Sequence, residues 1–127
     1  MPSENILLLG SESRQVLMEE LRHAGFDPTV CNRHPDAIQA FGTEDVVGIM
    51  VDAKTTDVDV LEFVLDVRDI DLHVPVAVLV SGLPKKDRAI LGRVPNTFLM
   101  STRPNIKAGV KRFSKFVQID IPRGGTA

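Results

Sequence analysis

Short apolar runs alternate with amphipathic stretches along the whole chain. Five runs are almost unbroken in hydrophobicity and bounded by turn residues, which is typical of strands buried on both faces of a parallel sheet. They cover residues 6–9, 29–31, 46–52, 74–80 and 97–100. Pro75 is compatible with the fourth run only near its start, because proline has no N–H to donate to a sheet. The pattern therefore predicts five strands.

Helical periodicity fills the intervals between these runs and follows the last one. The first helix, for example, carries Leu17, Leu21 and Ala24 at helical spacing, and Gly25 supplies a stop. The predicted helices cover residues 13–24, 35–41, 58–68, 84–91 and 104–117. Strands separated by helices need crossover connections, so the sheet should be parallel with helices on both faces. The prediction is a three-layer α/β sandwich.

Composition narrows the function classes. The chain has 127 residues, the size of one domain, and its formal net charge of -2 argues against a strongly basic nucleic-acid binder. It has no Trp or Tyr, so its six Phe are expected to pack the core rather than to stack on bases. No apolar stretch approaches the ~18 residues that span a bilayer, and the N-terminus is polar and not basic. We expect a cytoplasmic protein that binds neither nucleic acid nor membrane.

Motifs for nucleotides and metals are missing. Neither GxGxxG nor GxxxxGK[ST] occurs. The histidines His23, His34 and His73 accompany no ligand spacing such as HExxH or CxxC, so no metal site is expected and all three are predicted to lie at the surface. The single cysteine, Cys31, cannot form an internal disulfide and is predicted to be a small buried thiol.

The most informative polar residue is Asp52, which ends the third apolar run. In an open parallel sheet the ligand crevice lies outside the carboxyl ends of the strands, so a carboxylate projecting there meets ions and substrates rather than the core. Asp52 is therefore a candidate functional residue. The alternative is a carboxylate that caps the turn after its strand.

Several segments around Asp52 agree in order and spacing with one family. Residues 57–62 (DVDVLE) and 67–68 (VR) follow it at the spacing of an acidic residue, a Leu-Glu pair and an arginine, and residues 21–26 (LRHAGF) and 74–76 (VPV) match two further positions. With these segments the chain resembles the receiver domain of bacterial two-component response regulators. The proline and glycine that receivers carry in the turn after the aspartate are missing here.

The resemblance extends to about Val117. It implies the CheY-like, flavodoxin-like fold, with a five-stranded parallel sheet in the order 2-1-3-4-5 and helices on both faces. It also implies a receiver-like domain over residues 1–117, with a C-terminal tail or the start of a linker over residues 118–127.

In receivers, adjacent acids after the first strand bind magnesium. This chain has Gly10 and Ser11 there, followed by Glu12. Because Mg²⁺ needs several oxygen ligands in near-octahedral order, weak binding through Asp52 and backbone carbonyls is the most that this set predicts. No cofactor is expected.

At the two remaining switch positions the resemblance is incomplete. The position after the fourth strand where receivers carry a Ser or Thr falls on Val80 or on Ser81, depending on a one-residue shift, and Ser81 would preserve the hydroxyl. Ser101 stands where receivers carry a lysine. Phosphoryl transfer depends on positioning and on neutralising charge, so Asp52, the family's phosphoacceptor, should react slowly here. Lys54 and Arg103 are nearby cations that could substitute in part.

The last predicted helix offers an interaction surface. Lys107, Lys111 and Lys115 recur every fourth residue with Arg112 beside them, while apolar residues recur on another side. In receivers this helix belongs to a face that commonly mediates dimerisation and output. We expect it to bind a protein partner or an output domain, or to form a homodimer.

The sequence thus predicts a non-enzymatic pseudo-receiver in two-component-type signal transduction that acts by protein–protein interaction. Two alternatives remain open. One is a receiver that is phosphorylated on Asp52. The other is a small-molecule or anion-binding module on the same fold, which would use hydroxyls and N–H groups near Gly10, Ser11, Ser81 and Ser101.

Overall fold

The computed structural model describes residues 4–10, 15–54, 58–101 and 105–120, except for the side chains of residues 118–120. Within these residues strands and helices alternate along the chain. They are β1 (Glu4–Leu9), α1 (Gln15–His23), β2 (Phe26–Cys31), α2 (His34–Thr43), β3 (Gly48–Asp52), α3 (Val60–Ile70), β4 (Val76–Leu79), α4 (Lys85–Leu91), β5 (Thr97–Met100) and α5 (Ile106–Asp120).

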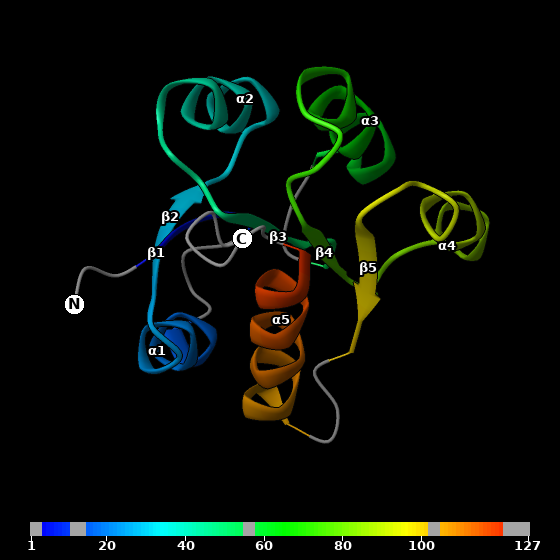
Figure 1. The fold of residues 1–127 in the computed structure, drawn as a ribbon. Coiled ribbons are helices and arrows are strands. Elements are labelled where there is room, and N and C mark those ends of the chain that lie inside the picture. The colour runs from blue at the N-terminus through cyan, green and yellow to red at the C-terminus, as the bar shows by residue number, and fades with distance from the viewer. Residues whose placement is uncertain (1–3, 11–14, 55–57, 102–104, 121–127) are drawn as a thin grey trace.

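The five strands form one sheet in the order β2-β1-β3-β4-β5, and each neighbouring pair is parallel. Helices α2, α3 and α4 lie along one face of the sheet, and α1 and α5 lie along the other (Figure 1). The predicted fold class and strand order are therefore confirmed. Because all strands are parallel, their carboxyl ends meet at a single edge of the sheet.

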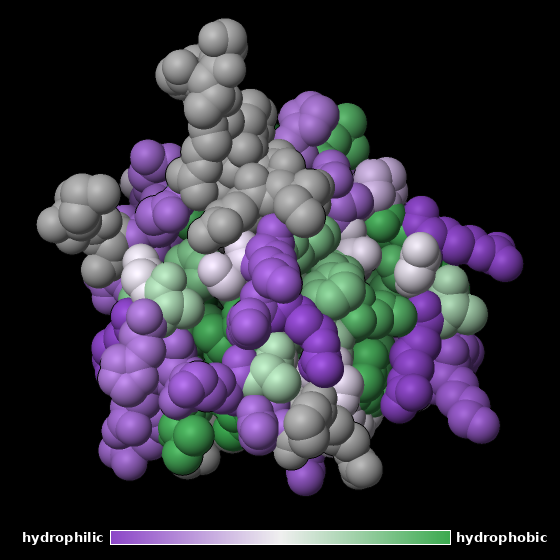
Figure 2. Space-filling model, turned by 60° about the horizontal axis from the view of Figure 1, so that its bottom comes forward, coloured by the Kyte–Doolittle hydropathy of each residue, from purple (hydrophilic) through white to green (hydrophobic). Residues whose placement is uncertain are grey.

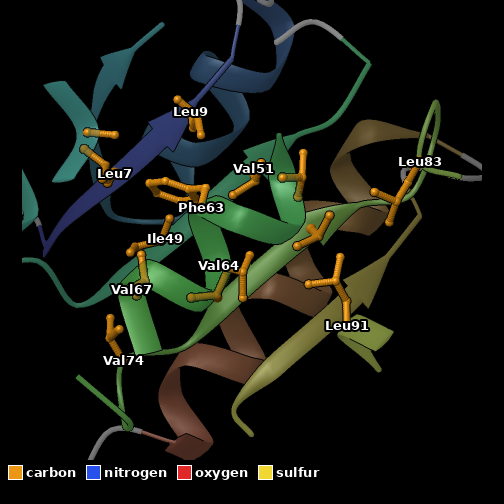
Figure 3. Close-up of a cluster of buried hydrophobic side chains, with 14 residues drawn as sticks. Leu7, Leu9, Ile49, Val51, Phe63, Val64, Val67, Val74, Leu83 and Leu91 are labelled. Atoms are coloured by element: carbon orange, nitrogen blue, oxygen red, sulfur yellow. The ribbon is translucent and has the colours of Figure 1, made fainter. Parts of the chain in front are cut away.

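Side chains of successive residues in a strand enter two different cores. In β1, Leu7 and Leu9 join the cluster beneath α2, α3 and α4, whereas Ile6 and Leu8 join the cluster beneath α1 and α5. Phe63 of α3, fully buried, lies among the aliphatic side chains of the first cluster (Figure 3). Burial on both faces explains why the strands appear in the sequence as continuous apolar runs rather than as alternating ones.

Several strand boundaries differ from the prediction. β2 begins at Phe26, three residues before the predicted run, and contains Pro28, which pairs opposite Ile6. This is tolerated because β2 is an edge strand in the described sheet, where a missing N–H need not break a ladder. β3 and β4 are shorter than their apolar runs. Val74, for example, lies outside β4 but is buried, since hydrophobicity reports burial and not sheet pairing.

The buried guanidinium of Arg68 ties α3 to the turn before β5. Its side chain is 6% exposed, and it donates hydrogen bonds to the carbonyl oxygens of Asp71 at 3.0 Å and Asn96 at 2.7 Å. The same Asn96 carbonyl accepts the N–H of Val76, the first residue of β4, at 3.0 Å. Arg68 therefore holds the amino ends of β4 and β5 against the end of α3.

We predict that Arg68→Met lowers the free energy of unfolding by about 2–3 kcal/mol, because methionine keeps the apolar stem but removes hydrogen bonds from a charged donor. The matched control is Arg93→Met, which changes an exposed arginine and should cost about 0.5 kcal/mol or less. Urea denaturation followed by circular dichroism measures both. Equal effects would mean that the buried hydrogen bonds of Arg68 add nothing to stability.

Candidate functional site

Asp52 is the last residue of β3 and pairs with Leu79 of β4 at the carboxyl edge of the sheet. Its side chain is 1% exposed, and its Oδ1 accepts the backbone N–H of Lys54 at 3.2 Å. The carboxylate is therefore not open to solvent, unlike the expected projection into a crevice. Its hydrogen bond to the N–H of Lys54 shows that Asp52 caps the turn after β3, as the alternative prediction had it.

Next to β3, the end of β1 supplies no described acid. Gly10 follows β1 and donates its N–H to the carbonyl of Cys31 at 3.1 Å, while Ser11 and Glu12 lie outside the described residues. Among the described His, Cys, Asp and Glu side chains, Asp52 belongs to no group of three that could hold a metal ion.

On the other side of β3, the two switch candidates follow β4 directly. Val80 is half-buried and donates its N–H to the carbonyl of Met100 at 3.0 Å, so its backbone continues the sheet. The Val80 carbonyl accepts the N–H of Leu83 at 3.0 Å and Nη2 of Arg88 at 3.3 Å. Ser81 is the exposed first residue of the turn that these bonds close.

The turns after β3 and β4 touch each other. Gly82 has a φ of +84°, and a Cβ at this position would stand 3.1 Å from Cα of Lys54 and 3.3 Å from its Cβ. Beside this contact lies a pocket of about 330 Å³. It is lined by Ala53, Val58, Asp59, Val60, Gly82, Leu83, Pro84 and Asp87. The turn after β4 thus packs against the backbone of Lys54, and the nearby hollow opens between the beginnings of α3 and α4.

At the end of β5, Ser101 is half-buried, and its carbonyl accepts Nη1 of Arg112 at 2.9 Å. Arg112 comes from α5, so a cation of this helix is bonded to the backbone of the residue that the resemblance aligns with the receivers' lysine. Arg112 is exposed, as the lysines of α5 are. Its guanidinium nevertheless has a hydrogen-bond partner in the backbone at the end of β5. The spacing of the basic residues predicted the correct helix but not the hydrogen bond between Arg112 and Ser101.

The lysines of α5 behave as the periodicity predicted. Lys107, Lys111 and Lys115 are all exposed, whereas Val110 and Phe113 are buried against the sheet. Hydrophilic side chains project across the face of the molecule formed by α1 and α5, with hydrophobic patches between them (Figure 2). We call Lys107, Lys111 and Lys115 the lysine stripe. Thr102 and Arg103 lie outside the described residues.

Two residues differ from their sequence-based expectation. Cys31 is half-buried rather than enclosed, and burial, together with the charges of Asp36 and Glu44, raises the pKa of its thiol. His34 was expected at the surface, yet its side chain is 22% exposed and its Nε2 lies 2.7 Å from Oδ2 of Asp66. The residues are 32 positions apart, so only the adjacency of α2 and α3 could reveal this contact.

Comparison with known proteins identifies the fold. No protein-family model matches the chain, and no curated protein matches its sequence. Among solved structures, the non-phosphorylated HemR receiver domain of Leptospira biflexa has a TM-score of 0.78 at 13% identity, covering 95% of this chain and 99% of that one. The chemotaxis response regulator CheY4 of Vibrio cholerae has a TM-score of 0.73 at 18% identity, covering 91% and 99%.

A third structure is the receiver domain of the sensor histidine kinase PA1611 of Pseudomonas aeruginosa PAO1, with a magnesium ion coordinated in its active-site cleft. It has a TM-score of 0.74 at 19% identity and covers 91% of this chain and 98% of that one. The chain therefore has the fold of response regulator receiver domains. Separately, none of the described helices is long and apolar enough to cross a membrane.

The contact between the two turns leads to a stability prediction. Gly82→Ala should destabilise the protein more than Gly25→Ala, by about 1 kcal/mol or more, because its Cβ must also displace the backbone of Lys54. Gly25 is a matched control: its φ is +95°, but a Cβ there meets nothing within 4 Å. Gly25→Ala should lower the free energy of unfolding only by the strain of a left-handed backbone, about 1–2 kcal/mol.

Denaturant unfolding of the two variants and the wild type measures the difference directly. Equal losses would show that the turns after β3 and β4 are not in tight contact.

Proposed function

We propose that the chain is a pseudo-receiver, a module of two-component-type signal transduction that binds proteins and does not rely on Mg²⁺-dependent phosphorylation. The observation that carries this proposal is the state of Asp52: 1% exposed, engaged with the turn after its strand, and outside every described group of metal-ligating side chains. The fold supplies the framework of a receiver, whereas the part of the chain that the structure describes places Asp52 in no group of three metal-ligating side chains.

Electrostatics explains why the burial matters. A phosphoryl donor brings several negative charges toward a carboxylate, and catalysis of such a transfer consists mainly of positioning and charge stabilisation. At the end of β5, a serine stands where the neutralising lysine would be, and its carbonyl is bonded to Arg112. The nearest cation in sequence, Lys54, contributes its N–H to Asp52 and has an exposed side chain. Asp52 therefore acts as a structural carboxylate.

The proposed partner surface is the lysine stripe on α5. Its three ammonium groups are exposed and lie at four-residue spacing on one helix, so they present one sign of charge along one line. Such a stripe fits an acidic protein surface, and charge complementarity of this kind mainly sets specificity and association rate. The partner would be a kinase, an output domain or another signalling protein, and no catalytic role is assigned to this chain.

The proposed domain boundary lies at the end of the packed part of α5. Residues 1–117 form the receiver-like unit, because Val117 is the last buried residue of the described core. Residues 118–127 are proposed to be a tail or the start of a linker, although α5 itself runs on to Asp120.

Whether Asp52 can accept a phosphoryl group can be tested directly. The protein is mixed with Mg²⁺ and beryllofluoride or acetyl phosphate while amide chemical shifts are recorded. We expect a spectrum unchanged at millimolar ligand, both for the wild type and for Asp52→Asn, because the aspartate is buried and belongs to no described group of three metal-ligating side chains. Shifts centred on Asp52 that spread to β5 and α5 and vanish in Asp52→Asn would establish a working phospho-switch instead.

The partner surface leads to a second prediction. A two-fold homodimer through α5 would place the lysine stripe against a copy of itself, and like charges repel most at low ionic strength. We therefore expect the chain to sediment as a monomer at both about 50 mM and about 500 mM NaCl, conditions that span weak and strong screening. A dimer that strengthens with salt, and strengthens further in Lys111→Gln, would assign the stripe to self-association.

A further inference from the structure

The face of the molecule formed by α2 and α3 carries a cluster that the receiver framework does not use. One ring nitrogen of His34, one carboxylate oxygen of Glu62 and one of Asp66 lie within 4.8 Å of one another. His34 is the first residue of α2, whereas Glu62 and Asp66 are one turn apart on α3. Helices α2 and α3 lie side by side over the same face of the sheet (Figure 1).

Local structure fixes the orientation of these groups. The His34 ring stands edge-on to the ring of Phe63, with 5.4 Å between centroids and an interplanar angle of 84°. Phe63 is fully buried, so the imidazole packs against a side chain of the core. On α3, residues at i and i+4 share one face, so Glu62 and Asp66 both project toward the same side. Pro35 at the start of α2 helps to fix where that helix begins, and with it the position of His34.

The spacing suits a small tetrahedral ion. With metal–ligand distances of about 2.0–2.2 Å, two ligand atoms on a tetrahedral centre are separated by about 3.3 Å. Nε2 of His34 and Oδ2 of Asp66 are 2.7 Å apart in a direct contact, and the carboxylate of Glu62 is exposed and within reach. Opening this contact from 2.7 Å to about 3.3 Å would match the ligand spacing of a tetrahedral ion.

The donor set selects the class of ion. Imidazole nitrogen with two carboxylates suits Zn²⁺ and similar first-row divalent ions, whereas Mg²⁺ and Ca²⁺ prefer oxygen ligands alone. Three protein ligands leave a fourth tetrahedral position for water or for a side chain from another molecule. An ion held here would also join α2 to α3, because its ligands come from both helices.

We propose that His34, Glu62 and Asp66 form a binding site for Zn²⁺ or a similar divalent transition-metal ion. The site is separate from Asp52 and does not depend on the pseudo-receiver assignment. It adds to the α2–α3 face a cation that crosslinks two helices and keeps one coordination position open.

The test is Zn²⁺ titration of metal-free full-length protein, with calorimetry for stoichiometry and thermal unfolding for stability. We expect one Zn²⁺ per chain and a rise in Tm, with no such response to Mg²⁺. Losing a residue that merely orients a ligand costs about 10–100-fold in metal affinity, so Glu62→Gln, Asp66→Asn and His34→Gln should each weaken binding at least about tenfold. Amide spectra check that each variant remains folded.

Matched controls are Asp69→Asn, which makes the same charge change at an exposed position on α3, and His73→Gln, which changes an exposed histidine. Both should bind Zn²⁺ as the wild type does. Glu62→Gln keeps the test decisive if His34→Gln unfolds, because Glu62 is exposed. Binding that survives all three ligand variants would place the ion elsewhere, and the absence of saturable binding would leave only an ion pair between two helices. Either result overturns the proposal, as would equal affinity for Mg²⁺.

Discussion

Burial of a parallel sheet between two layers of helices is the constraint from which the remaining structure follows. A central strand such as β3 must present apolar side chains to both faces, so a polar group is acceptable only where a strand ends. Asp52 lies at such an end. Since the strands are parallel, the ends of β1, β4 and β5 come to the same edge, and the character of that edge is decided by a few residues in short turns.

Among the described residues, two of these turns are in contact. The carboxylate of Asp52 accepts the N–H of Lys54, and Gly82 permits the turn after β4 to approach the backbone of Lys54 closely. Arg112 meets the carbonyl of Ser101 at the end of β5. The fold of receiver domains is therefore present, while the chemistry of this edge is decided by the residues in its turns. Fold and chemistry are separable properties of the same strands.

The sequence predicted the fold well because the signal for it is repeated in every element. Hydrophobic runs and helical periods define five strands and five helices even where single boundaries shift, as at Pro28, which obscured the beginning of β2. The state of the site depends on single contacts between distant segments. Nothing local indicates that Asp52 is covered, that Arg112 reaches Ser101, or that His34 meets Asp66. Such contacts arise only once the packing of helices on the sheet is known.

Pro28 also has a consequence for association between molecules. An edge strand with a full set of N–H groups is a template on which another strand can pair, and natural proteins often interrupt such edges with proline. β2 forms one margin of the described sheet, and Pro28 removes a donor near its centre. Growth of the sheet from one molecule into the next is therefore discouraged at this margin. Association at this margin then depends on side chains rather than on the pairing of backbone groups.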